Sequence, residues 1–575
     1  MVKIIKQTAS MQTRDGVRLD ADIYRPDTDE ELPILLMRQP YGREIASTVV
    51  YAHPRWYAAQ GYIVVIQDVR GRGTSGGEFD LFTHEVADGL DTINWVSQLP
   101  NSTGKVGMYG FSYQGMTQLY TAVHQPECLK AIAPAMVAYD LYADWAYENG
   151  AFCLYANLAW AIQLAGETAR LKGDEAAYLE LRAASGNLPL NGSIPANPEL
   201  MERLAPDSFY HQWLNNPDPT AEYWQRRCLR LASQSPKYLL ANVNIPMLHV
   251  GGWFDPYLRG TLNLYRAMTA KSKQPQHLLV GPWAHLPWGR KLGAVDYGIE
   301  AQNPLDEIQI RWFDHWLKGK DTGLLEESPI SLFEMGSNQW REFDYFADNL
   351  KIYYLASDGL ASMREDSGML WEYEEAIAES ISPSGLLETN LTEQVTEFAN
   401  NTDVLVHDPW RPVPALGGHA SYPGGSFERS GLDCRSDILT YTSAPLDADL
   451  HIAGAITVEV YCTVEYASFD LCAVLSTVDA DGRVFNFTQG YLRVASPAQD
   501  TNIVSIPLQA TCMCINQTQS LRLSLSAACF PAYPVNPGTG KLPHESRLID
   551  MQIITLSIHS GVDYPSQIKL SVANL

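Results

Sequence analysis

The segment over residues 105–123 is the feature that most constrains the fold of this chain. A short apolar stretch, residues 105–109, leads into Gly-Phe-Ser-Tyr-Gln-Gly at residues 110–115, and a helix-compatible run follows over residues 116–123. A strand that turns sharply into a helix around a serine is typical of a nucleophile elbow, which exposes the hydroxyl at the end of a sheet. The flanking glycines permit the tight turn. We therefore predict that Ser112 is a nucleophile in an α/β layer structure.

A second Gly-x-Ser-x-Gly pattern lies at residues 73–77 and overlaps a Gly-x-Gly-x-x-Gly pattern at residues 71–76. The predicted strand before them ends at residue 69, well ahead of Ser75, and no helix begins directly after the glycines. A nucleophile elbow and a dinucleotide site both need that helix. We predict that residues 71–77 form a glycine-rich surface loop.

The periodicity of the chain changes three times. Strands and helices alternate over residues 1–138, and an uninterrupted apolar strand there suits a sheet that is covered on both faces. Residues 139–236 lose the strands and read as a helical insertion, and the α/β pattern resumes over residues 237–345. Residues 346–575 are nearly all β, which favours a sandwich of the jelly-roll type.

A nucleophilic serine needs a base, and the base needs a carboxylate that orients it. In α/β-hydrolases these partners follow the serine in the order acid, histidine, on loops at the carboxyl ends of strands. Asp255 follows a predicted strand at residues 247–250, and His285 follows the next one at residues 278–280. We predict that this pair completes the triad. The rival histidines are predicted to be packed inside strands or on a helix; they are His249, His277 and His315.

An acyl-transfer site also needs two donors for the oxyanion. The backbone N–H of Tyr113, directly after the serine, is expected to be one of them. The second is expected from the loop at residues 38–42, where the hydroxyl of Tyr41 is a candidate. An ordinary packed tyrosine is the alternative for Tyr41.

Composition excludes several classes of partner. The chain has 575 residues, which suggests two to four domains, and a net charge of −25, which argues against nucleic acid or an anionic membrane as a partner. No apolar run is long enough to span a bilayer, and residues 1–10 lack the apolar core of a signal peptide, so we expect a cytoplasmic protein. The nine cysteines form no Cys-x-x-Cys pair, and we predict neither a zinc site nor a disulfide framework.

Several motifs in a fixed order extend over nearly the whole chain, and through them it resembles the cocaine esterase-like (CocE/NonD-type) serine hydrolases of the X-prolyl dipeptidyl-peptidase superfamily. The resemblance implies an α/β-hydrolase core with an inserted helical cap and a C-terminal jelly roll. It also implies Ser112, Asp255 and His285 as the triad, with Tyr41 and Tyr113 at the oxyanion. The motifs are Arg-Asp-Gly-Val-Arg-Leu (14–19), Gln-Pro-Tyr (39–41), Gln-Asp-Val-Arg-Gly (67–71), the elbow (110–115), Gly-Trp-Phe-Asp (252–255), Gly-Pro-Trp-Ala-His (281–285) and Pro-Ala-Leu-Gly-Gly (414–418).

The resemblance also suggests where the substrate binds. In the esterases of this family two cap tryptophans line the acyl pocket, and Trp145 and Trp160 fall at similar positions, although packing of the cap core is the alternative. The jelly-roll stretch that reaches the pocket is His-Ala-Ser-Tyr here, ending at Tyr422. It is more polar than in those esterases, so an aryl-ester preference does not follow. Glu148 is a candidate contact for a substrate amine.

These residues predict a serine hydrolase, free of metal and cofactor, that cleaves an ester or amide of a small carboxylic acid through an acyl-enzyme. The alternatives on the same triad are an Xaa-Pro-type dipeptidyl-peptidase and an alpha-amino-acid ester hydrolase or acyltransferase. A non-catalytic protein that binds through its jelly roll is a further alternative from a different class. The aromatic cap is compatible with homodimer contacts and equally with a lid.

Overall fold

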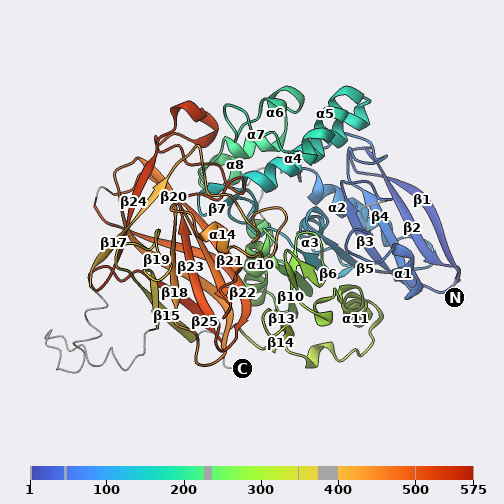
Figure 1. The fold of residues 1–575 in the computed structure, drawn as a ribbon. Helices are drawn as coiled ribbons and strands as arrows, with labels where there is room; N and C mark the ends of the chain where they lie inside the picture. Colours follow the sequence, from blue (N-terminus) through green and yellow to red (C-terminus); the bar gives the residue numbers. More distant parts are fainter. Residues whose placement is uncertain are drawn as a thin grey trace.

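The computed structural model describes residues 3–44, 48–225, 236–346, 349–372, 399–498 and 500–573. Two large sheets organise these residues, one of ten and one of eleven strands, and helices α4 to α8 lie along one side of the molecule next to both (Figure 1). The first sheet and its helices come from residues 4–343, and the second sheet comes from residues 349–572. We call the second part, from β15 onward, the β domain.

The ten-stranded sheet has a parallel centre and antiparallel edges. Neighbouring strands from β4 to β13 run parallel, whereas β1, β2 and β14 pair in the antiparallel sense. The carboxyl ends of the parallel strands therefore meet at one edge of the sheet. In spatial order the strands are β1 (Ile4–Gln12), β2 (Arg18–Pro26), β4 (Ile63–Asp68), β3 (Leu32–Gln39), β5 (Ser102–Phe111), β6 (Leu129–Ala135), β9 (Met247–Phe254), β10 (Gln276–Ala284), β13 (Ile330–Glu334) and β14 (Gln339–Phe343).

Helices cover both faces of this sheet, which explains why its central strands are apolar throughout. Successive residues of β4 illustrate this, because Val64 packs with the core of one face and Val65 with that of the other. Helices α2 and α3 share a core on the Val65 side, and α1 and α11 on the Val64 side. The bounds of these four helices are α1 (Pro54–Ala59), α2 (Glu85–Val96), α3 (Tyr113–Ala122) and α11 (Leu305–Lys318), and the helix that follows β9 is α10 (Leu258–Lys271).

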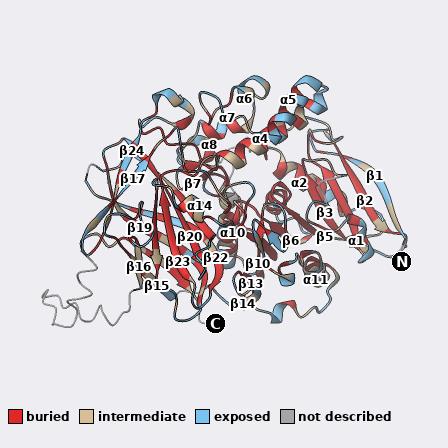
Figure 2. Ribbon diagram, in the orientation of Figure 1, coloured by how far each residue is buried: buried red, intermediate tan, exposed pale blue. Residues whose placement is uncertain are grey.

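The chain between β6 and β9 is mainly helical. Its apolar side chains, such as Leu158 and Trp213, join the same core as α2 and α3, so this region packs directly on the sheet's helical layer. Helix α5 is exposed along most of its length (Figure 2). The elements are η2 (Tyr142–Ala146), β7 (Tyr147–Glu148), β8 (Ala151–Phe152), α4 (Leu154–Lys172), α5 (Glu175–Gly186), α6 (Glu199–Leu204), α7 (Phe209–Leu214), α8 (Glu222–Gln225) and α9 (Pro236–Leu239).

The β domain packs against the ten-stranded sheet through a shared apolar core. Leu278 and Leu332 of that sheet belong to the same buried cluster as Ile456 and Leu508 of the β domain. Strands β20 and β23 are buried almost throughout (Figure 2). The strands are β15 (Asn349–Ala356), β16 (Met369–Glu372), β17 (Asn401–His407), β18 (Ile438–Ser443), β19 (Leu450–Val464), β20 (Ser468–Val478), β21 (Val484–Ala495), β22 (Asn502–Ile515), β23 (Ser520–Ser526), β24 (Ile554–Ser560) and β25 (Gln567–Val572), with a short helix α14 (Ser430–Asp433).

The fold predicted from the sequence is confirmed: an α/β-hydrolase core, a helical insertion within it and an all-β C-terminal domain. His315 lies on a helix as predicted; this helix is α11, and Gly319 ends it in the left-handed conformation. The boundaries of the four predicted segments stay predictions. None of the described helices is both long enough and apolar enough to cross a membrane.

Candidate active site

Ser112 lies between the end of β5 and the start of α3. Its backbone has φ 58° and ψ −126°, a region that residues other than glycine rarely adopt. The turn needs the glycines beside it, because a Cβ atom at Gly110 would lie 2.5 Å from the Cβ of Gln114, and one at Gly115 would lie 2.4 Å from a methyl group of Val137. The Ser112 N–H donates to the carbonyl of Ala135 at 2.9 Å. The sequence thus folds into the tight strand-to-helix turn that holds a nucleophilic serine.

Asp255 and His285 follow directly after β9 and β10, which are neighbouring parallel strands. The Nδ1 atom of His285 lies 2.8 Å from Oδ1 of Asp255. Asp255 is fully buried, and burial raises the pKa of its carboxyl, against the opposing effect of the hydrogen bond from His285. A carboxylate at Nδ1 selects the tautomer that leaves Nε2 free to accept a proton.

The ring of His285 lies beside the elbow. Its centroid is 5.4 Å from that of Phe111, the residue before Ser112. The side chain of His285 is 28% exposed, whereas Ser112 is only 6% exposed. The structure therefore brings the three predicted residues together at the carboxyl edge of the ten-stranded sheet, with Ser112, Asp255 and His285 on three different strand ends.

Tyr41 lies in the loop after β3, where it was expected. The indole N–H of Trp160 donates to its hydroxyl at 3.0 Å. An indole nitrogen can only donate, so the Tyr41 oxygen accepts and its own proton remains available. Burial raises the pKa of Tyr41 to about 12, while hydrogen bonds with Trp160 and Ser112 act in the opposite direction. The phenol consequently stays protonated at neutral pH and can donate toward the serine.

Tyr113 is the first residue of α3, and its side chain fixes the start of this helix. Its hydroxyl donates to Glu85 at 2.8 Å, and Glu85 in turn is paired with the buried Arg38 at 2.6 Å. The ring stacks on Phe82 with centroids 4.7 Å apart. The backbone N–H of Tyr113 is therefore held on a rigid helix end next to Ser112.

An aromatic wall connects the helical region to the histidine. Trp145 lies between Trp160 and Tyr257, with ring centroids 5.1 Å and 4.2 Å away, and Tyr257 lies 5.0 Å from His285. The indole nitrogen of Trp145 is buried and has no hydrogen-bond partner among the described residues. Sequence reasoning did not find Tyr257, although its position two residues after Asp255 was an available signal.

Glu148 lies in a buried polar cluster between the helical region and the β domain. Its Oε2 atom is 2.9 Å from Arg259, 2.9 Å from His419 and 2.6 Å from the hydroxyl of Tyr533. Burial alone would raise the pKa of Glu148, but Arg259, His419 and Tyr533 outweigh it and hold that pKa well below its usual range. The carboxylate is thus ionised and already paired within the protein. Tyr422 lies outside this cluster, because it is 72% exposed and faces Tyr155.

The β domain contacts the loop of the candidate acid directly. The side-chain amide of Gln509 on β22 donates to the carbonyl oxygens of Trp253 at 2.8 Å and Asp255 at 3.0 Å. Gln509 is buried. No sequence signal pointed to this residue, which is 254 positions from Asp255 along the chain.

The remaining sequence candidates have structural roles. Ser75 donates its hydroxyl to the carbonyl of Asp68 at 2.8 Å and accepts from the amide of Asp20, and α2 begins only at Glu85. His249 is buried in β9, where it bonds to Gln276, and burial lowers its pKa to about 4. The loop at residues 71–77 is therefore neither an elbow nor a dinucleotide site.

The comparisons with known proteins agree with this geometry. The family profile of the X-Pro dipeptidyl-peptidase (S15 family) matches residues 15–287, and that of the X-Pro dipeptidyl-peptidase C-terminal non-catalytic domain matches residues 327–569. The cocaine esterase of Rhodococcus sp. (strain MB1 Bresler) is 30% identical over 588 aligned positions, which cover 97% of each chain.

Two solved structures share the fold. An aminopeptidase from the marine sediment archaeon Thaumarchaeota archaeon superposes with a TM-score of 0.79 at 22% identity, covering 100% of this chain and 97% of that one. An alpha-amino acid ester hydrolase superposes with a TM-score of 0.76 at 22% identity, covering 99% and 97%. Fold, motifs and relatives define a serine hydrolase of the α/β-hydrolase class. The chain belongs to the cocaine esterase-like group of the X-Pro dipeptidyl-peptidase (S15) family.

Proposed function

We propose that this protein is an esterase that cleaves small carboxylic esters with an apolar acyl group, through an acyl-enzyme on Ser112. The observation that carries the proposal is the Asp255–His285 pair at 2.8 Å beside the strained elbow serine. The full-length similarity to an esterase supports the choice of ester chemistry.

The reaction follows from the roles of four groups. Nε2 of His285 accepts the proton of Ser112 as the serine oxygen bonds to the acyl carbon, while Asp255 stabilises the imidazolium. The Tyr41 hydroxyl and the Tyr113 N–H donate to the oxyanion. The imidazolium then protonates the departing alcohol as the ester bond breaks. Water attacks the acyl-enzyme in the same manner, releasing the acid and restoring the serine.

The aromatic wall supports an apolar acyl group. Trp145, Trp160 and Tyr257 form a continuous series of buried aromatic rings that ends at His285. The indole N–H of Trp145, which has no hydrogen-bond partner in the described part of the chain, is a donor for one polar atom on that group. Glu148 argues against a substrate ammonium, because Arg259 already neutralises its charge and His419 also bonds to the same oxygen. We therefore favour a simple ester over an aminoacyl or Xaa-Pro substrate.

The experiment is labelling with a fluorophosphonate probe, followed by a substrate panel. We expect the wild type to be labelled and Ser112→Ala to remain unlabelled. The panel compares nitrophenyl acetate and benzoate with alanyl and Ala-Pro nitroanilides, and we expect turnover of the esters only. Faster turnover of an aminoacyl anilide would overturn the esterase proposal, and labelling that persists in Ser112→Ala would overturn the triad.

A further inference from the structure

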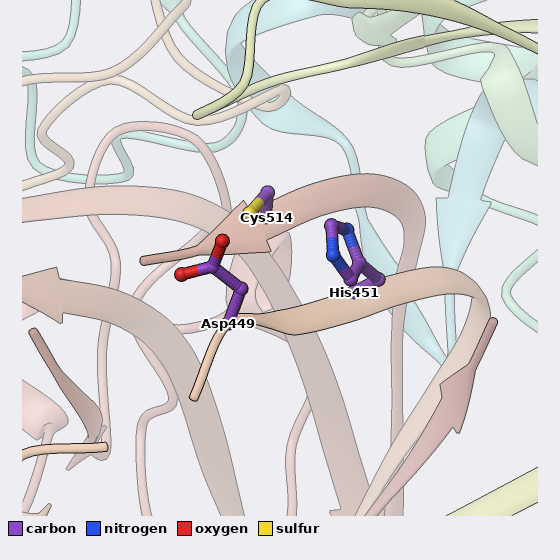
Figure 3. Close-up of side chains that lie close together, drawn as sticks. All are labelled: Asp449, His451 and Cys514. Atoms are coloured by element: carbon purple, nitrogen blue, oxygen red, sulfur yellow. The ribbon is translucent and has the colours of Figure 1, made fainter. Parts of the chain in front are cut away.

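Three side chains with different donor atoms come together at the seam between the two sheets, outside the candidate active site. They are Asp449, His451 and Cys514 (Figure 3). One carboxylate oxygen, one ring nitrogen and the sulfur all lie within 4.8 Å of one another. These are the three kinds of ligand that proteins use for zinc.

The β-sheet register fixes this cluster. Asp449 directly precedes β19 and His451 is its second residue, so their side chains, two positions apart in extended chain, project from the same face. Cys514 on β22 pairs directly with His451 across the antiparallel ladder. Asp449 is fixed further, because Oδ1 accepts from the backbone N–H of Gln517 at 2.7 Å. The positions of the three donor atoms are therefore set mainly by the pairing of β19 with β22.

The histidine has the neighbour that metal-bound histidines commonly have. Its Nδ1 atom lies 2.7 Å from Oε1 of Glu334, a fully buried residue at the end of β13. Glu334 is itself held by Arg341 at 2.9 Å and by Ser337. A carboxylate on Nδ1 orients the ring and leaves Nε2 as the nitrogen that can bind a cation.

We propose that Asp449, His451 and Cys514 bind one zinc-type divalent cation, with water as the fourth ligand. A thiolate and a carboxylate balance the two positive charges, and the imidazole binds as the neutral form. The Cys514 thiol gives up its proton to solvent as the metal–sulfur bond forms, so binding releases one proton. The site is independent of the esterase proposal.

The position of the site indicates a structural role. The backbone N–H of Cys514 donates to the carbonyl of Met335 at 2.8 Å, and the N–H of Met335 donates to the carbonyl of Cys512 at 3.0 Å. Met335 is the residue after β13, so these two hydrogen bonds connect β22 to the end of β13. A cation bound to His451 and Cys514 would stabilise the contact between the β domain and the ten-stranded sheet, because His451 is also bonded to Glu334 of that sheet. Because a cation that binds only the folded state stabilises it, the expected effect is a higher unfolding temperature with unchanged ester turnover.

Cobalt(II) tests the site on the full-length protein, because a thiolate ligand gives Co²⁺ a charge-transfer absorption that oxygen and nitrogen ligands lack. We expect chelator-treated protein to bind one Co²⁺ with this band, Zn²⁺ to displace it, and Zn²⁺ to raise Tm. Cys514→Ser should abolish the band. Glu334→Gln should keep it with at least tenfold weaker binding.

The matched control is Cys434→Ser, which removes an exposed thiol outside the cluster and should leave the band intact. Asp449→Asn changes an exposed residue and keeps the test decisive if Cys514→Ser fails to fold; it should weaken Co²⁺ binding at least tenfold. Absence of a thiolate band in the wild type, its persistence in Cys514→Ser, or unchanged affinity in Asp449→Asn would overturn the proposal.

Discussion

The ten-stranded sheet and the β domain contribute to the candidate site in different ways. The parallel sheet supplies Ser112, Asp255 and His285, each directly after a strand. The β domain supplies contacts that hold the site together, from Gln509 to the loop of the acid and from His419 and Tyr533 to Glu148. Parallel strands bring many carboxyl ends to one edge, whereas the antiparallel domain offers a rigid wall. The candidate reacting groups thus come from the parallel sheet, and the contacts that hold their surroundings in place come from the β domain.

Removing a reacting group should have the largest effect. We expect Ser112→Ala to lower kcat on the order of 10⁴-fold or more, because the acyl-enzyme can no longer form. Its Tm should be equal to or higher than that of the wild type. The measurement is kcat with nitrophenyl acetate. If kcat falls by less than tenfold in Ser112→Ala, the nucleophile is not at the end of β5 in the parallel sheet.

Removing an oxyanion donor should have the next largest effect. Tyr41→Phe keeps the ring and deletes the hydroxyl, and we expect a loss in kcat of roughly 10²–10³-fold with little change in KM. Trp160→Phe is the comparison variant, because it removes the indole N–H that donates to Tyr41, together with part of the ring, but keeps the Tyr41 hydroxyl. A larger loss in Trp160→Phe than in Tyr41→Phe would contradict the assigned donor.

A supporting contact from the β domain should matter less. Gln509→Leu removes both hydrogen bonds to the acid's loop, and we expect kcat to fall roughly tenfold because small displacements of catalytic groups reduce rate. The pH–rate profile should shift as well, since the Asp255–His285 pair moves, whereas a loss of stability alone would leave the profile unchanged. Gln519→Leu, in a turn that bonds to Asp479, should leave kcat and the profile intact.

Glu148 should affect stability more than rate. Because its pKa is lowered in the folded protein, the ionised carboxylate stabilises the fold above about pH 4.5, and this contribution fades as the pH falls below that value. We expect Glu148→Gln to destabilise the protein by about 3 kcal/mol at pH 7, because it leaves Arg259 poorly paired.

The difference in stability between Glu148→Gln and the wild type should shrink below pH 4.5, as measured by urea unfolding across the pH range. Ester turnover should change only a few-fold. The ratio of ester turnover to aminoacyl-anilide turnover should be about the same in Glu148→Gln and in the wild type. If this ratio rises more than tenfold in Glu148→Gln, Glu148 is a substrate contact.

The sequence was most informative for residues whose position follows from the neighbouring segment of the chain. The elbow, Asp255 and His285 could be predicted, because each follows a strand and parallel strand ends must converge. Gln509 and the partners of Glu148 could not, because these contacts join distant segments and leave no periodic signal. The side chain of Tyr113 is a similar case, since its bond to Glu85 depends on how α2 and α3 pack.

The backbone of Ser112 has an evolutionary consequence. With φ at 58°, this position would favour glycine if stability alone were selected, because glycine adopts that conformation without steric strain. The proposed nucleophile therefore stands at a position where glycine would be less strained. We expect Ser112→Gly to relieve this backbone strain while abolishing the proposed hydrolysis, so a related chain with glycine at this position is not expected to form an acyl-enzyme.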